Sequence, residues 1–478
     1  MGSHTGFIDI KREKPGYRPV RERIKDFEAV EKQLPEEKII HQAARCMDCG
    51  VPFCHGYGCP LANVMPEWNE LVFRKKYKEA LQILLSTNPF PEFTARICPA
   101  LCEASCVLGI NAEPVTIRQI ELFIIEKGFE EGWIKPVDTI TRIHRKVAII
   151  GSGPAGLSAA DDLNKKGYTV TVFESAAYPG GILRYGIPDY KLEKWVVERR
   201  INIMEAEGIT FETGIKAGVD VSLNYLQKRF DALCLAGGSQ KPRDLPIPGR
   251  KLEGIYFAME FLSQQNRIIG RELKKDKNII SANKKTVTVV GGGDTGADCI
   301  GTALRQGAKE VLQLEIMPKP PLTRSASTPW PAWEYMLRTS SSHKEGCERR
   351  WSVATDSFKG KSGKVTGLHC KEVIWERDDA GSPLKFTAKP GSSFYIKSDL
   401  VLLALGFTGV KKNSMLESFG VRLTDKGTLY KDNYDMTNIK NIFVTGDMSK
   451  GASLVVHAIA DGKSTAQKID SYLTLNLQ

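Results

Sequence analysis

The stretch Lys146-Val-Ala-Ile-Ile-Gly-Ser-Gly-Pro-Ala-Gly156 decides the fold class of this chain. It opens with a short apolar run, which is typical of a buried parallel strand. The motif Gly151-x-Gly153-x-x-Gly156 and an Ala/Leu-rich helix follow, and a second strand ends at Glu174. A lone GxGxxG is weak, but strand, motif, helix, strand and acid in this order predict a dinucleotide-binding unit.

Each residue of the motif has its own predicted role. Gly151 permits the tight turn, Gly153 lets a pyrophosphate approach, and Gly156 lets helix and strand pack closely. The helix that begins at Pro154 and Ala155 supplies backbone donors and a favourable dipole to the phosphates. Glu174 is placed to accept hydrogen bonds from an adenosine ribose.

The same unit recurs later in the chain. A strand over 286–290 precedes Gly291-x-Gly293-x-x-Gly296, with Asp294 and Thr295 opening the helix, and the next strand ends before Glu315. A carboxylate at that point suits a free ribose 2′-hydroxyl and repels a 2′-phosphate, which favours NADH. Lys319 and Arg324 could still serve a phosphate, and the plain alternative is that Glu315 points into solvent.

Two further apolar segments end in small residues, and a third follows them near the end of the sequence. The segments 230–238 and 398–406 are each expected to close one nucleotide-binding domain, and glycines such as Gly406 let a backbone pass close to a cofactor. The last segment, 441–447, is followed by a Gly/Ser turn and a helix from about Leu454.

Seven of the eleven cysteines lie between Cys46 and Cys106. Thiolates at such short spacings bind soft metals or iron–sulfur clusters. Seven do not divide into zinc tetrads, and Cys-Pro at 59–60 and 98–99 is typical of ferredoxin-type runs. Two four-iron clusters with one non-cysteine ligand are favoured, with zinc or free core cysteines as the alternatives. Cys234 and Cys299 lie in apolar contexts and are expected to be buried small hydrophobes.

Composition narrows the class of protein. The chain has 478 residues, enough for several domains, and a net charge of +11 that is spread along its length. A solvated basic surface or docking to an acidic partner explains that charge, and no motif indicates nucleic-acid binding. Membrane-spanning runs and a secretion signal are not expected, so the protein is expected to be cytoplasmic, where clustered cysteines favour metal over disulfides.

The N-terminal part is predicted to be an all-α module around the cysteines. Helix is expected over 20–45 with an interruption near Pro35, over 75–86 and over 116–128, with a linker at 128–145. The Pro- and Trp-rich region 317–351 is expected to be either a lid or docking surface, or a merely exposed insertion.

Several of these motifs together resemble the small subunit of bacterial glutamate synthase across essentially the whole chain. They are Cys46-Met-Asp-Cys-Gly50, Val51-Pro-Phe-Cys54, Arg96-Ile-Cys-Pro-Ala-Leu-Cys-Glu-Ala-Ser-Cys106, Gly151-Ser-Gly-Pro-Ala-Gly156, Tyr185-Gly-Ile-Pro-Asp-Tyr-Lys-Leu192, Gly291-Gly-Gly-Asp-Thr-Gly296 and Val444-Thr-Gly-Asp447. The segments Met317-Pro-Lys-Pro-Pro321 and Thr328-Pro-Trp-Pro-Ala-Trp333 look specific to that family.

The resemblance implies an α/β fold with an N-terminal all-α iron–sulfur module and two Rossmann-like domains of the disulfide-reductase type, one inserted in the other. The implied bounds are 1–140 for the iron–sulfur domain, 141–280 with 408–478 for the FAD domain, and 281–407 for the NAD(P)H domain. Cys46, Cys49, Cys54 and Cys106 would hold one 4Fe-4S cluster, and Cys59, Cys98, Cys102 and Glu121 the other. The shared motifs also make flavin-site candidates of Gly181, Arg184, Ile187, Lys191, Gly446, Asp447, Ser453 and Leu454.

The implied activity is electron input: NADH or NADPH reduces FAD, and the clusters pass electrons to a large subunit that makes L-glutamate from L-glutamine and 2-oxoglutarate. No catalytic side chain is required for the hydride transfer, because the cofactors carry the chemistry. The alternatives are a bifurcating ferredoxin:NADPH transhydrogenase-type subunit with another acceptor protein, and a non-catalytic electron-transfer scaffold.

Overall fold

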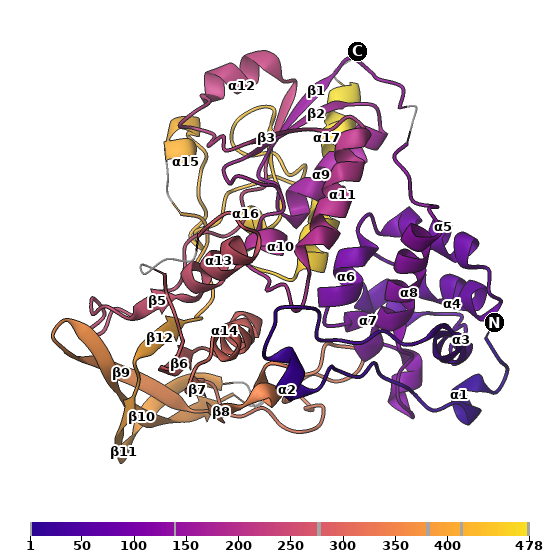
Figure 1. The fold of residues 1–478 in the computed structure, drawn as a ribbon. Coiled ribbons are helices and arrows are strands. Elements are labelled where there is room, and N and C mark those ends of the chain that lie inside the picture. Colours follow the sequence, from indigo (N-terminus) through magenta and orange to yellow (C-terminus); the bar gives the residue numbers. More distant parts are fainter. Residues whose placement is uncertain (1, 138–139, 275–278, 379–382, 412–413, 476–478) are drawn as a thin grey trace.

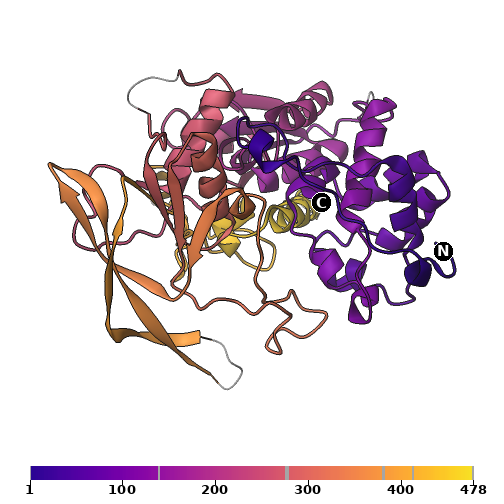
Figure 2. The same cartoon turned by 60° about the horizontal axis from the view of Figure 1, so that its bottom comes forward.

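The computed structural model describes residues 2–137, 140–274, 279–378, 383–411 and 414–475. A helical module lies to one side of two parallel sheets, and an antiparallel sheet projects at the opposite end (Figures 1 and 2). None of the helices in these ranges is long and apolar enough to cross a membrane.

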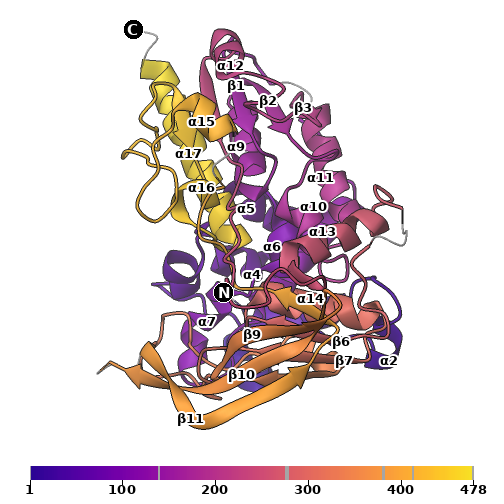
Figure 3. The ribbon, with the colours of Figure 1, turned by 90° about the vertical axis from the view of Figure 1, so that its left-hand side faces the viewer.

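The first sheet carries the first glycine motif. Its five strands, in the order β13-β4-β1-β2-β3, are all parallel. The strands are β1 (Lys146–Ile150), β2 (Thr169–Glu174), β3 (Thr210–Thr213), β4 (Ala232–Leu235) and β13 (Ile442–Val444). The accompanying helices are α9 (Pro154–Lys165), α10 (Ile182–Tyr185), α11 (Lys194–Ala206), α12 (Leu223–Arg229), α15 (Ser414–Phe419), α16 (Asp447–Lys450) and α17 (Val455–Leu475). Strand β13 thus returns to this sheet after the second sheet is complete, and α17 packs beside α9 (Figure 3).

The second sheet is also parallel, in the order β5-β12-β6-β7-β8. Its elements are β5 (Ile255–Phe257), α13 (Ala258–Ile269), β6 (Thr286–Val290), α14 (Asp294–Arg305), β7 (Glu310–Leu314), a 3-10 turn at His343–Glu345, β8 (Cys347–Arg350) and β12 (Leu400–Leu403). The second unit therefore begins before the predicted residue 281, because β5 pairs with β12. Strand β5 has only three residues and no glycine motif, so the sequence pattern did not reveal it.

A three-stranded antiparallel sheet was not predicted. It consists of β9 (Val353–Lys361), β10 (Lys364–Arg377) and β11 (Pro383–Lys397), and it projects from the second unit. Its long strands carry many lysines and little apolar alternation, which hid them from the periodicity argument.

The helical module confirms the helices expected near 75–86 and 116–128. Its elements are α1 (Gly6–Asp9), α2 (Val20–Arg23), α3 (Glu36–Ala44), a π-helical turn at Cys54–Gly58, α4 (Met65–Phe73), α5 (Tyr77–Thr87), α6 (Pro91–Ile97), α7 (Leu101–Ala104), a 3-10 turn at Val107–Ile110 and α8 (Ile117–Glu130). The expected linker follows α8, although positions 138–139 within it lie outside the described residues.

The prediction of a helix over 20–45 was wrong for most of residues 24–35. Only α2 and α3 form, and the chain between them is an extended arm. The backbone N–H of Val30 donates to Tyr190 O at 3.0 Å, and Arg18 N donates to Val30 O at 3.0 Å. Tertiary hydrogen bonds have replaced the helical ones along this arm.

The core of the first unit is shared with the helical module. Leu61, Phe90 and Phe93 of the module are buried in the same apolar cluster as the strands of the first sheet. Cys234 and Cys299 are fully buried in apolar surroundings, as expected. The module is thus packed directly against the first nucleotide-binding unit.

Candidate functional site

The first glycine motif forms a tight turn between β1 and α9 in which two positions exclude a side chain. Gly151 has φ +108°, and a Cβ there would lie 2.6 Å from Ala236 O. A Cβ on Gly156 would lie 2.0 Å from Gly151 O. In contrast, no described atom lies within 4 Å of a Cβ built on Gly153, so this side of the turn is open for a phosphate to approach.

Two segments remote in sequence approach the same turn. Gly181 has φ +52°, and a Cβ there would lie 2.7 Å from Gly153 Cα. Gly446 has φ +64°, and its Cβ would lie 2.7 Å from Ala155 Cβ. Gly462 of α17 packs so closely on α9 that a Cβ would lie 2.2 Å from Ala155 O. The tertiary structure therefore gathers the glycines at 181 and 446 around the predicted pyrophosphate position.

The segment after Gly446 places two polar side chains in contact near the first glycine turn. Asp447 opens α16, and its Oδ1 accepts a hydrogen bond from Ser453 Oγ at 2.9 Å. Burial raises the pKa of Asp447. Leu454 and Ile187 are both partly buried against the core of the first unit. The four predicted flavin-site residues Asp447, Ser453, Leu454 and Ile187 therefore lie near the first glycine turn or against the apolar core of the first unit.

Glu174 lies at the edge of the turn, where the motif predicts it. Its Oε2 accepts hydrogen bonds from Ser152 N at 3.1 Å and Ser152 Oγ at 2.5 Å, and its Oε1 accepts from Ala176 N at 2.7 Å. The carboxylate thereby ties the first glycine turn to the end of β2. Its role as a ribose ligand stays a prediction.

Arg184 and Lys191 are ion-paired at the boundary between the two nucleotide-binding units. Arg184 contacts Glu198 of the first unit and Glu272 of the second, both at 3.1 Å. Lys191 pairs with Asp298 of α14. Their side chains therefore join the two units, and a direct role toward flavin stays a prediction.

The second glycine motif repeats the geometry of the first. Gly291 has φ +123°, and a Cβ there would lie 2.2 Å from Ala404 O at the end of β12. No described atom comes within 4 Å of a Cβ on Gly293. Asp294 and Thr295 form the first turn of α14.

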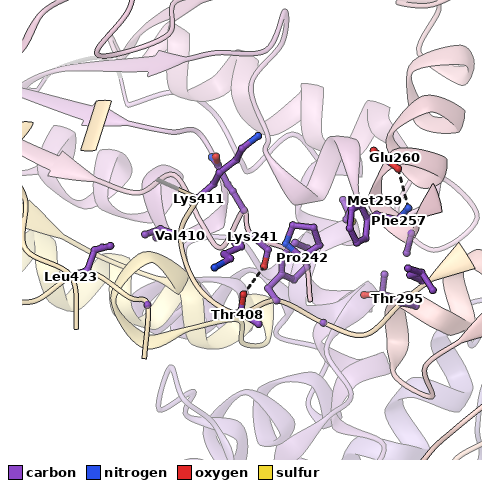
Figure 4. Close-up of a pocket in the computed structure, with 17 residues that line it drawn as sticks. Lys241, Pro242, Phe257, Met259, Glu260, Thr295, Thr408, Val410, Lys411 and Leu423 are labelled. Carbon is purple, nitrogen blue, oxygen red and sulfur yellow. Dashed lines mark hydrogen bonds between the residues drawn. The ribbon is translucent and has the colours of Figure 1, made fainter. Parts of the chain in front are cut away.

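A cavity of about 680 Å³ opens beside this second motif, between the two units (Figure 4). It lies at the carboxyl ends of the parallel strands, the edge at which such sheets bind nucleotides. Residues that line it include Lys241, Pro242, Phe257, Met259, Thr295 and Gly406. The cavity is therefore the candidate site for the nicotinamide coenzyme.

Glu315 lies against the second glycine turn rather than simply facing solvent. Its Oε1 accepts a hydrogen bond from Met317 N at 3.0 Å, and a Cβ on Gly292 would lie 2.0 Å from Glu315 Oε2. The two cations that sequence reasoning placed nearby have other contacts. Lys319 lies over the ring of Trp351, 5.2 Å from its centroid, and Arg324 binds elsewhere.

The charge of Glu315 also acts on Arg349 of β8, whose guanidinium lies 4.8 Å from the centroid of the same Trp351 ring. Burial lowers the pKa of the Arg349 guanidinium, and the charge of Glu315 opposes that shift. Arg349 Nη1 also donates to Arg338 O at 3.1 Å. The sequence held no signal for this arginine, because the parallel pairing of β7 with β8 places it opposite Gln313, two residues before Glu315, only in the folded chain.

In the helical module the cysteines fall into two groups. Cys46, Cys49, Cys54 and Cys106 line one small pocket, which we call the outer set. Burial raises the pKa of Cys46, Cys49 and Cys54, and the charge of Cys106 raises each of them further.

The inner set is Cys59, Cys98, Cys102 and Glu121. Burial raises the pKa of Cys59 to about 12 and that of Cys98 to about 11, and the negative charge of Glu121 adds to both shifts. Burial also raises the pKa of Glu121 to about 7, although its Oε1 accepts hydrogen bonds from Asn88 Nδ2 at 3.0 Å and Thr94 Oγ1 at 2.6 Å. Buried, mutually repelling donors of this kind fit a group of positive ions that binds thiolates.

The Pro- and Trp-rich region reaches across to the helical module. The ring of Trp330 lies 4.7 Å from that of Phe53, next to Cys54 of the outer set. Arg324 Nη2 donates to Ala104 O at 3.0 Å, between the two last cysteines. This region is therefore an internal docking element and not merely an exposed insertion.

Two family models match the chain. The pyridine nucleotide-disulphide oxidoreductase model matches residues 145–462, and the model of dihydropyrimidine dehydrogenase domain II, a 4Fe-4S cluster domain, matches residues 23–133. The chain thus combines an NAD(P)H-dependent flavoprotein unit with an iron–sulfur domain. The second match favours iron–sulfur chemistry over the zinc interpretation of the cysteines.

Relatives define the family more narrowly. The NADPH glutamate synthase small chain of Mycobacterium tuberculosis (strain CDC 1551 / Oshkosh) is 48% identical over 99% of this chain and 96% of the relative. The NADPH glutamate synthase small chain of Bacillus subtilis is 44% identical over 99% of both chains. The chain belongs to the glutamate synthase small-chain family, and it is an NAD(P)H-dependent oxidoreductase with flavin and 4Fe-4S cofactors.

A solved structure supports the fold. FprA of Mycobacterium tuberculosis in complex with NADPH matches with a TM-score of 0.54 at 20% identity, over 70% of this chain and 85% of that chain. This likeness confirms the fold of the two units.

Proposed function

We propose that this chain is the electron-input subunit of glutamate synthase. It oxidises NAD(P)H through FAD and delivers the electrons, through two 4Fe-4S clusters, to a large chain that forms L-glutamate from L-glutamine and 2-oxoglutarate. The flavin supplies the conversion of a two-electron hydride donor into one-electron steps. The residues of the chain bind, orient and shield the cofactors.

The first glycine turn is the proposed flavin pyrophosphate site. Gly153 leaves space for the phosphates, while Gly181 and Gly446 bring two further backbone segments to the same turn. Pro154 and Ala155 begin the helix whose N-terminus favours negative charge. Glu174 is the proposed acceptor for the ribose hydroxyls, since it lies at the end of the neighbouring strand.

The cavity beside the second turn is the proposed coenzyme site. Asp294 and Thr295 begin the helix proposed to face the phosphates, and Gly406 also lines the cavity. Glu315 favours NADH through the free 2′-hydroxyl, as the sequence predicts. Arg349 is a proposed acceptor for a 2′-phosphate instead, because the charge of Glu315 acts on it and it lies over the same Trp351 ring as Lys319.

The proposed direction of electron flow rests on where the two sets of cysteines pack. Cys59 and Cys98 of the inner set pack against the apolar core of the first unit. We therefore propose that a cluster held by the inner set receives electrons from the flavin. Cys49 of the outer set is half-buried, and Val51 and Tyr57, which follow Cys49 and Cys54 in sequence, are 72% and 57% exposed. The outer set is therefore the proposed exit.

The proposed partner is the glutamate synthase large chain, docked over this exit. The exposed apolar residues Val51, Tyr57 and Ile110 follow ligands of the outer set in sequence, and we propose that the large chain covers them. The NADH glutamate synthase of Schizosaccharomyces pombe also supports association, since this chain matches 22% of that longer protein at 45% identity. We place the assembly in the cytoplasm, where thiols stay available to iron.

Anaerobic purification and reconstitution test the proposal. The wild type should hold one flavin and about eight irons with equal sulfide, reduce a dye with NAD(P)H, and support glutamate formation only with the large chain. Cys54→Ala and Cys98→Ala should each lose about half of the iron, because each removes one ligand of one cluster.

Cys347→Ala is the matched control, since Cys347 is half-buried and lies outside both sets. Stoichiometric zinc without sulfide would overturn the cluster assignment. A protein that binds flavin and iron but does not oxidise NADH or NADPH would overturn the enzymatic role and leave the electron-transfer scaffold.

A further inference from the structure

A line of hydrogen bonds runs beneath the second glycine turn, and the proposed function does not account for it. Gln313 of β7 is 1% exposed, and its Nε2 donates to Gly291 O at 2.9 Å. Its Oε1 lies 2.9 Å from Nε2 of His343. The side chain therefore joins the first glycine of the turn to a histidine.

The contacts define the protonation state of His343. An amide oxygen can only accept, so Nε2 of His343 carries the proton and donates to Gln313. Nδ1 is then an acceptor, and it receives hydrogen bonds from Ser340 N at 3.1 Å and from the Ser340 hydroxyl at 3.0 Å. Burial, aided by the charges of Arg349 and Lys191, lowers the pKa of His343 to about 4, so the ring is neutral near pH 7. In each hydrogen bond from Ser340 through His343 and Gln313 to Gly291 O, the donor and the acceptor are therefore defined.

The carbonyl that receives this bond belongs to a tightly confined peptide. A Cβ on Gly291 would lie 2.2 Å from Ala404 O, and one on Gly296 would lie 2.5 Å from Gly291 O. The orientation of this peptide decides where the following N–H groups of the turn point. Those groups form the phosphate-binding end of α14.

The first glycine turn is held in a different way. There Ser152 follows the first glycine, and its N–H and hydroxyl both bind Glu174. Gly292 occupies the corresponding place in the second turn and has no hydroxyl. The residue that matches Gln313 in β2, two positions before the terminal acid, is Val172, which cannot form a hydrogen bond. The second turn is therefore held by Gln313 from within strand β7, whereas the first turn is held by Glu174 at the end of β2.

We infer that Gln313 and His343 are positioning residues that hold the second glycine turn in its coenzyme-binding conformation. They set the affinity for NAD(P)H without touching it. The inference rests on the proposed use of this turn for the coenzyme.

Three variants separate the parts of this line. Gln313→Leu removes both hydrogen bonds of the side chain. Gln313→Glu in its ionised form keeps an acceptor for His343 but has no donor for Gly291 O, so above the pKa of that carboxyl it should behave like Gln313→Leu. His343→Ala should have a smaller effect in the same direction. His369→Ala is the matched control, because His369 is exposed on β10.

The expected result is a split between KM and kcat. One lost hydrogen bond corresponds to a rise of about 2- to 10-fold in KM for NAD(P)H. The flavin content and kcat at saturating coenzyme should stay at the wild-type values, since no residue of the flavin site changes. In ¹⁵N spectra of histidine-labelled protein, His343 should show the neutral tautomer with the proton on Nε2.

A second measurement does not depend on activity. Amide hydrogen exchange at residues 291–296 should be faster in Gln313→Leu and His343→Ala than in the wild type and His369→Ala. Unchanged KM and unchanged exchange in both variants would overturn the inference. Faster exchange in a protein whose wild type does not oxidise NAD(P)H would instead refute the proposed function and retain the support role. If Gln313→Leu fails to bind flavin, the KM and the exchange of His343→Ala test the inference instead. That variant removes the hydrogen bond between His343 and Gln313 and leaves Gln313 in place.

Discussion

Replacing Glu345 by Gln should loosen the extended N-terminal arm from the second nucleotide-binding unit. Glu345 Oε1 accepts from Arg23 Nε at 2.6 Å, and Glu345 Oε2 accepts from Arg305 Nη1 at 2.7 Å. The side chains of Arg23 and Arg305 are 3% and 0% exposed, and that of Glu345 is fully buried. One carboxylate therefore pairs with two buried cations.

The magnitude follows from that burial. Removing one partner of a buried ion pair leaves an uncompensated charge, which costs about 3–5 kcal/mol. Part of the contact survives, because Arg23 still donates to Ser341 O at 3.0 Å and Arg305 to Gly301 O at 2.9 Å. A loss of this size is large against the roughly 5–15 kcal/mol that stabilises a typical native protein.

Urea unfolding of the flavin-bound protein measures the effect, with hydrogen exchange over residues 17–34 to locate it. Glu348→Gln is the control, since the exposed pair of Glu348 and Arg350 should contribute under about 1 kcal/mol. If Glu345→Gln destabilises the protein no more than Glu348→Gln does, the buried carboxylate does not hold the arm and the reasoning fails.

Three further changes test the cofactor sites. Glu315→Gln should narrow a preference of the wild type for NADH in dye reduction, mainly by lowering KM for NADPH, because a negative charge beside the 2′-phosphate is removed; a wild-type kcat/KM that is higher with NADPH would contradict this. Glu174→Ala should weaken flavin binding by roughly 1.5–3 kcal/mol for each charge-assisted hydrogen bond lost, seen as flavin loss on gel filtration. Full flavin retention would remove Glu174 from the ribose site. Trp330→Ala should cost about 0.5–1.5 kcal/mol through its ring contact with Phe53 and speed hydrogen exchange over residues 49–58, an effect that Trp333→Ala should not reproduce.

The comparison of expectation with structure shows where local pattern is enough. The strands at 146–150 and 286–290, and the turns at Gly151 and Gly291, were predictable because their causes lie within a few residues. A buried parallel strand needs an apolar run, and a turn with positive φ favours glycine. The arm between α2 and α3 shows the opposite case, since its helix-like sequence is extended by hydrogen bonds to Tyr190 and Arg18.

By itself, the sequence determined that two dinucleotide-binding units and a cysteine-rich module follow one another, because each is marked by residues close together along the chain. Only the tertiary structure decided that Arg349 lies opposite Gln313, that Trp330 contacts Phe53 next to Cys54, and that Gln313 joins His343 to Gly291. Those contacts join residues on different strands and modules. Their formation depends on how the sheets and helices pack, which no local pattern of side chains encodes.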